Sequence, residues 1–163
     1  MLDTPNARQQ WQSINKLVPQ EIAALLSLSQ AVAKSGLESE LLELVKLKSS
    51  QLNGCAFCLQ MHATDARKMK MSEEKLQLLP AWREAPVYSA RERAALAWTE
   101  SLTLVAQDRH GVPDDVYEAA SSAFSEAELA HLTSAVVLIN AWNRLAIAYR
   151  FTPMVAAANV QAA

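Results

Sequence analysis

Apolar residues recur at helical spacing along most of this chain. Residues 19–34 carry one apolar stripe, and residues 38–51 carry a second. On that second stripe, four side chains share one side of the expected helix: Leu41, Leu44, Val45 and Lys48. Spacings of three and four residues are typical of a helix that buries one face, and no useful run of strand-like alternation interrupts them. The pattern therefore predicts an all-α fold, a bundle of about six to eight helices.

Start and stop residues divide this pattern into separate helices. Pro19 suits a first helical turn, and Gly36 suits the position just after a helix. Capping boxes at Ser89-x-x-Glu92 and Ser125-x-x-Glu128 predict two further helix starts. The expected helices span about residues 19–34, 38–51, 55–69, 72–79, 91–107, 113–123 and 125–150. Residues 1–17 are expected to form an arm that lies on the body through three apolar side chains: Trp11, Ile14 and Leu17.

Length and charge narrow the class of protein. The chain has 163 residues, 15 basic and 17 acidic, for a net charge of −2. A prior of roughly 150 residues per domain predicts one domain over residues 1–163. The balanced charge offers no electrostatic footprint for nucleic acid, and no apolar run is long enough to cross a membrane. Without a signal-peptide pattern, we expect a cytoplasmic protein.

The two cysteines carry the clearest chemical signal. Cys55 and Cys58 follow Asn53-Gly54, a pair that readily breaks a helix, and His62 comes four residues after Cys58. On a helix that begins at Cys55, all three side chains lie on one face within two turns. A helix N-terminus stabilises a thiolate, and His62 is placed to accept the proton of Cys58. This arrangement predicts a reactive Cys58.

The chemistry expected of such a pair is redox. A Cys58 thiolate can attack a peroxide and become a sulfenic acid, which Cys55 can convert to a disulfide. The displaced oxygen needs a proton, and Glu43, twelve residues before Cys55, is the candidate for the relay. No G-x-G-x-x-G or P-loop motif is present, so we expect no cofactor and reduction through an external dithiol.

Other interpretations of the same residues stay open. Cys55, Cys58 and His62 could supply three zinc ligands, with Glu43 or a remote His as the fourth. The absence of a second C-x-x-C and of an H-x₃₋₅-H pair favours redox chemistry, and we predict no metal site. His110 and His131 are expected to be surface or capping residues.

These residues also resemble a known family. Residues 43–67 contain S-S-Q-L-N-G-C-A-F-C-x-x-x-H followed by Asp65-Ala-Arg67. This segment is similar to the alkylhydroperoxidase D-like (AhpD-like) core of the carboxymuconolactone decarboxylase superfamily. The similarity continues through Glu92-Arg-Ala-Ala-Leu-Ala-Trp98 and Ile139-Asn-Ala-Trp-Asn-Arg144. It covers about residues 15–150, with the core motif at about 38–70.

The resemblance implies an AhpD-like helical bundle that assembles into a homo-oligomer, a trimer or hexamer. It implies reduction of a small hydroperoxide, with Cys58 as the peroxidatic and Cys55 as the resolving cysteine. His62 and Glu43 would carry the proton relay, and an external dithiol, in the best-studied members a dihydrolipoyl protein, would restore the thiols. One position departs from the family. The best-studied members have a second His before the peroxidatic cysteine, where this chain has Phe57.

Two other functions remain as alternatives. The chain could be a decarboxylase-like enzyme in which the cysteines are incidental. It could also be a redox or metal-responsive binding protein in which the same cysteines switch an oligomer interface. Substitution of Cys58 by serine distinguishes the first alternative, and metal content distinguishes the second.

Overall fold

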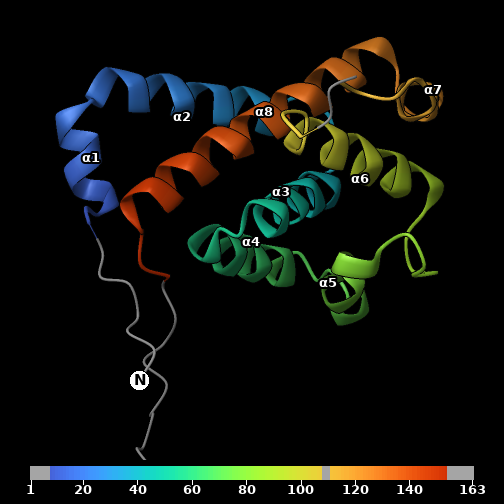
Figure 1. The fold of residues 1–163 in the computed structure, drawn as a ribbon, viewed down its shortest axis with the longest axis horizontal. Coiled ribbons are helices and arrows are strands. Elements are labelled where there is room, and N and C mark those ends of the chain that lie inside the picture. The colour runs from blue at the N-terminus through green and yellow to red at the C-terminus, as the bar shows by residue number, and fades with distance from the viewer. Residues whose placement is uncertain (1–7, 108–110, 154–163) are drawn as a thin grey trace, which may run out of the picture.

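The computed structural model describes residues 8–107 and 111–153. Throughout these ranges the secondary structure is helical, with no strand (Figure 1). The elements are α1 (Trp11–Leu17), α2 (Pro19–Ala33), α3 (Ser39–Asn53), α4 (Ala56–Lys68), α5 (Glu73–Leu78), the 3₁₀ turn η1 (Leu79–Ala81), α6 (Ala90–Thr103), α7 (Asp114–Ala123) and α8 (Glu126–Tyr149). The predicted all-α fold is confirmed.

Local start signals account for most helix N-termini. Pro19 occupies the first turn of α2, and both predicted capping boxes form at α6 and α8. The predicted end of α6 is wrong, because the helix stops at Thr103 rather than near residue 107. Val105, just beyond that end, is exposed. Another helical turn there would bury little apolar surface, so packing does not extend the helix.

The N-terminal arm is partly as predicted. Its residues form the short helix α1, in which Ile14 is buried and Trp11 packs edge-on against Trp142, with ring centroids 5.5 Å apart. The expectation for Leu17 is wrong, since 66% of this residue is exposed. Leu17 is the last residue of α1, where the chain turns into α2, and the packing of that end does not cover its side chain.

Helix α3 lies at the centre of the bundle, between α4 and the α6–α8 layer (Figure 1). From Leu41 to Ser50 every residue except Lys46 is buried, so α3 has no solvated face over these turns. A helix buried all round needs partners for its polar side chains. Lys48, predicted on the apolar stripe, is buried and bonds Glu100 of α6 at 2.7 Å.

The helix α8 crosses the bundle beside α2 and closes the side of the molecule that holds the cysteines (Figure 1). A small apolar cluster there joins Ile14, Ile22, Cys55, Cys58, Ala146 and Phe151. None of the helices in the described ranges has the length and apolar character of a membrane span. His110 lies outside the described residues.

Candidate active site at the start of α4

A sharp turn between α3 and α4 places the two cysteines. Gly54 has a φ of 69°, in the left-handed region that glycine adopts without steric cost. The N–H of Cys55 then donates to the carbonyl of Ser50 at 3.0 Å and closes the end of α3. Only Gly54 and Cys55 lie between the end of α3 at Asn53 and the start of α4 at Ala56.

Cys55 is the N-cap of α4, one position before the helix itself. Its sulfur accepts a hydrogen bond from the Cys58 N–H at 3.3 Å. A disulfide joins Cys55 to Cys58, with the two Cα atoms 5.4 Å apart, and both residues are buried. The structure therefore places the pair at the positive end of a 13-residue helix, as the sequence predicted.

The side chains of His62 and Glu43 are hydrogen-bonded to each other. His62 is two turns into α4, and its Nδ1 lies 2.8 Å from Glu43 Oε2 on α3. Both side chains are buried, with 7% of His62 and 5% of Glu43 exposed. Burial acts to raise the pKa of Glu43, but the hydrogen bond and charge of His62 and the ammonium of Lys46 outweigh it and hold that pKa below its usual value. Glu43 is thus a charged partner of His62.

Lys46 completes this group, and the sequence analysis did not include it. It lies one turn after Glu43 on α3, and its Nζ is 2.6 Å from Glu43 Oε1. One carboxylate therefore binds an imidazole through one oxygen and an ammonium through the other. The spacing of three residues between Glu43 and Lys46 is the signal that could have revealed the pair.

Three potential metal ligands lie close together in the same region. Ligand atoms of Glu43, His62 and Asp65 lie within 4.8 Å of one another. Lysines already bind both carboxylates, since Lys68 contacts Asp65 at 2.8 Å and Lys46 contacts Glu43. These three residues and the two lysines therefore form a charge-balanced cluster.

An apolar pocket of about 390 Å³ opens onto Cys58 and His62. Its walls come chiefly from α2, α4 and α8, with contributions from α1 and from Phe151 after α8. Phe57, which replaces the second His of the family, is part of this wall and packs edge-on against Phe151, with ring centroids 5.6 Å apart. The position that would carry a titratable group is thus apolar here. Trp11 and Trp142 widen the aromatic surface of the same pocket.

Hydrogen-bonded amides, of which Asn143 is buried, connect the turn before the cysteines to α8. Asn53 Nδ2 donates to Asn140 Oδ1 at 3.0 Å and to Asn143 Oδ1 at 2.9 Å. Asn143 Nδ2 in turn donates to Ser50 Oγ at 3.1 Å. Sequence analysis missed this network, because its members lie about 90 positions apart and no local spacing connects them. His131, on α8, is exposed, in agreement with its predicted surface role.

Comparisons with known proteins identify the family. Residues 19–101 match the model of the carboxymuconolactone decarboxylase family. The chain belongs to this family, as its motifs indicated.

Particular relatives are more informative about the whole fold. The chain is 36% identical to the uncharacterized protein YdfG of Bacillus subtilis (strain 168), over 83% of this chain and 91% of YdfG. It is 38% identical to a protein of unknown function from Agrobacterium tumefaciens, whose crystal structure is known and which is proposed to be the antioxidant defence protein AhpD. That comparison covers 93% of this chain and 100% of the other, with a TM-score of 0.86. A peroxidase-related protein from Silicibacter sp. TM1040 shares the fold at 21% identity and a TM-score of 0.68, over 82% of this chain and 70% of its own.

Proposed function

We propose that this protein is a thiol-dependent peroxidase that reduces organic hydroperoxides through a Cys55–Cys58 dithiol. The proposal rests on how the cysteine pair, the Glu43–His62 pair and the apolar pocket lie relative to one another. The Cys55–Cys58 pair stands at the N-terminus of α4, Glu43 and His62 are hydrogen-bonded beside it, and Cys58 and His62 share the wall of an apolar pocket. Membership of the carboxymuconolactone decarboxylase family and the likeness to a proposed AhpD protein support it.

The proposed cycle consumes two thiols for each peroxide. The Cys58 thiolate attacks the terminal oxygen of ROOH, the O–O bond breaks, and the products are Cys58 sulfenic acid and an alkoxide that takes up a proton. The Cys55 thiol then attacks the Cys58 sulfur, and water leaves as the disulfide forms. An external dithiol reduces this disulfide by exchange and is itself oxidised. The sum is ROOH and a dithiol converted to ROH, water and a disulfide.

His62 is the proposed proton carrier. Its Nδ1 is engaged by Glu43, so Nε2 is the ring nitrogen proposed to exchange the proton. In the cycle His62 takes the proton of Cys58 before the attack and returns one to the departing alkoxide. Glu43 fixes the ring and stabilises the imidazolium formed in between.

The pocket argues for an organic peroxide over hydrogen peroxide. Its volume of about 390 Å³ falls within the range of small-molecule sites. Side chains such as Phe57, Leu138 and Trp142 would bury an alkyl or aryl group, which hydrogen peroxide lacks. Each buried CH₂ contributes about 0.8 kcal/mol to binding. We therefore propose a hydroperoxide with an apolar substituent.

Other aspects of the function stay predictions from the sequence and from the family resemblance. These are an external dithiol such as a dihydrolipoyl protein, a cytoplasmic location, and a trimeric or hexameric assembly. Exposed apolar side chains on α2 and α8, among them Leu26, Val137 and Ile147, are available to such an assembly.

The deciding experiment is a thiol count on reduced, chelator-treated protein before and after one equivalent of cumene hydroperoxide. We expect rapid loss of both thiols and a Cys55–Cys58 disulfide in the peptide map. In Cys55→Ser, a sulfenic acid at Cys58 should be trapped by dimedone. Oxidation by hydrogen peroxide should be slower than by cumene hydroperoxide.

The two serine variants are matched controls for each other, because Cys55 and Cys58 are the only cysteines of the chain. Cys58→Ser should leave Cys55 reduced under the same conditions. Two thiols that stay reduced in the wild type contradict the proposal. Activity of any kind that survives in Cys58→Ser would instead favour decarboxylase-like chemistry with incidental cysteines.

A further inference from the structure

Lys46 binds the carboxylate oxygen of Glu43 that His62 does not contact. Its ammonium nitrogen is 2.6 Å from Glu43 Oε1, while Glu43 Oε2 is 2.8 Å from His62 Nδ1. Lys46 also stands in the wall of the same pocket as Cys58 and His62. It is the one residue between Leu41 and Ser50 that is not buried, with 24% of its side chain exposed. Its charge thus lies at the edge of an apolar site, where charges are poorly screened.

The positive and negative charges around His62 are equal in number when the imidazole is neutral. From α3 come Glu43 and Lys46, and from α4 come Asp65 and its partner Lys68. The α2 and α8 walls of the pocket contribute apolar side chains and Ser29. The other charged groups nearby are engaged elsewhere, since Lys48 of α3 binds Glu100 and Arg144 of α8 binds Asn140. Two carboxylates therefore face two ammonium groups.

This balance has a consequence for proton transfer. A fixed positive charge favours the deprotonated form of every titratable neighbour, a thiolate over a thiol and a neutral imidazole over an imidazolium. Without Lys46, the buried carboxylate of Glu43 would have His62 as its only cationic partner in the relay. The Cys58–His62 pair would then lose its first proton only at a higher pH.

We propose that Lys46 is a positioning residue of this site. Its ammonium group holds the Glu43 carboxylate against His62, and its charge allows the Cys58–His62 pair to lose a proton at a lower pH. The inference rests on the proposed function in one respect, that Cys58 is the reacting thiol. Lys46 contacts Glu43, and its proposed effect on His62 is therefore exerted through the Glu43 carboxylate.

The test measures the rate of alkylation of Cys58 by iodoacetamide against pH, which requires no peroxide. All variants are made in the Cys55→Ser background, so that a single thiol reacts. In Lys46→Met the acid limb of the profile should move up by about one pH unit, which lowers the rate on that limb about tenfold. Lys46→Arg keeps the charge and should restore the wild-type limb. The NMR shifts of the His62 ring protons, assigned with His62→Gln, should titrate at correspondingly higher pH in Lys46→Met.

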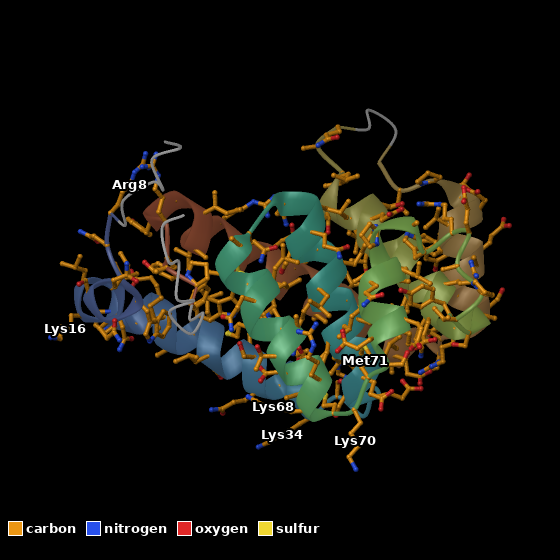
Figure 2. The ribbon with its side chains drawn as sticks, turned by 90° about the horizontal axis from the view of Figure 1, so that it is seen from below. Arg8, Lys16, Lys34, Lys68, Lys70 and Met71 are labelled. Atoms are coloured by element: carbon orange, nitrogen blue, oxygen red, sulfur yellow. A yellow bond between two sulfur atoms is a disulfide. The ribbon has the colours of Figure 1, made fainter. Side chains whose placement is uncertain are left out.

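Lys34→Met is the matched control, because Lys34 is an exposed lysine that extends from the outer surface at the end of α2 (Figure 2). It should leave the profile unchanged. An acid limb that does not move in Lys46→Met, or that moves equally in Lys34→Met, overturns the inference. If Lys46→Met fails to fold, the neutral and polar Lys46→Gln gives the same comparison. If peroxide does not oxidise Cys58, the proposed function fails, and the alkylation profile still decides the role of Lys46.

Discussion

Single residues set the geometry of the cysteine pair. Gly54 allows α3 to end and α4 to begin with only two residues between them, and Cys55 caps the new helix through its sulfur. A β-carbon at Gly54 would meet no atom within 4 Å. The glycine is therefore needed for its backbone conformation and not for space.

We expect Gly54→Ala to destabilise the protein by about 1–2 kcal/mol, the cost of a left-handed conformation for a residue with a β-carbon. Urea unfolding measures the loss. Gly36→Ala is the control, since Gly36 also has a positive φ and open space around it but lies outside the site. Both variants should lose similar stability, and oxidation of the thiols by peroxide should slow only in Gly54→Ala. A Gly54→Ala protein as stable as the wild type would show that this turn carries no conformational strain.

Pairs of helices hold that turn in place. α3 and α8 are joined next to the cysteines by the amides of Asn53, Asn140 and Asn143. Asn143 is completely buried and bonds both Asn53 and Ser50. A buried network of this kind stabilises one register of the two helices, because any shift leaves polar groups unpaired.

Asn143→Ala should lower the free energy of unfolding by about 1–3 kcal/mol, since it removes the hydrogen bond to the buried Ser50 hydroxyl and leaves Asn53 with Asn140 as its partner on α8. The measurement is chemical denaturation at neutral pH. Ser134→Ala serves as the control on the same helix, because the Ser134 hydroxyl bonds only its own helix at the Ala130 carbonyl. That substitution should change stability by less than about 0.5 kcal/mol. Equal effects of the two substitutions would argue against the network as a link between α3 and α8.

At the scale of the whole molecule, ion pairs between carboxylates and basic side chains connect separate helices. Arg91 of α6 bonds Glu38 before α3 and Glu128 of α8. The pKa of Glu128 lies at about 2, because the Ser125 backbone N–H and the Arg91 guanidinium bond its carboxylate. Burial acts to raise the pKa of Glu100, but hydrogen bonds from Lys48, Trp82 and Arg83 outweigh it and leave that pKa lowered.

These shifts predict a protein that loses stability in acid. Each of these carboxyls has a lower pKa folded than unfolded, so the unfolded chain binds more protons between the two values. The stabilisation is fully present above the unfolded value of about 4.5 and is lost as pH falls toward 2. The urea midpoint should therefore be nearly constant above about pH 5 and fall from there to pH 3. Glu128→Gln should flatten this dependence more than Glu126→Gln, a neighbouring exposed residue in the same helical turn. A midpoint independent of pH would contradict the prediction.

The sequence by itself determined the helices and the face that carries the cysteine chemistry. Capping boxes, Pro19 and Gly54 act within a few residues, so their effects do not depend on the rest of the fold. The same holds for Cys55, Cys58 and His62, which one helix places together. The position of Glu43 beside His62 follows for a related reason, since one tight turn fixes how α3 lies against α4, and its role in a proton relay stays a prediction.

The tertiary structure alone decided what surrounds these residues. Leu17 is exposed and α6 ends early because burial depends on which helix lies opposite, and local spacing does not contain that information. The pocket beside Cys58 is built from separate helices, and the amides that hold the cysteine turn come from α3 and α8. Such contacts join distant parts of the chain, because apolar side chains and buried polar groups find partners only when the helices pack.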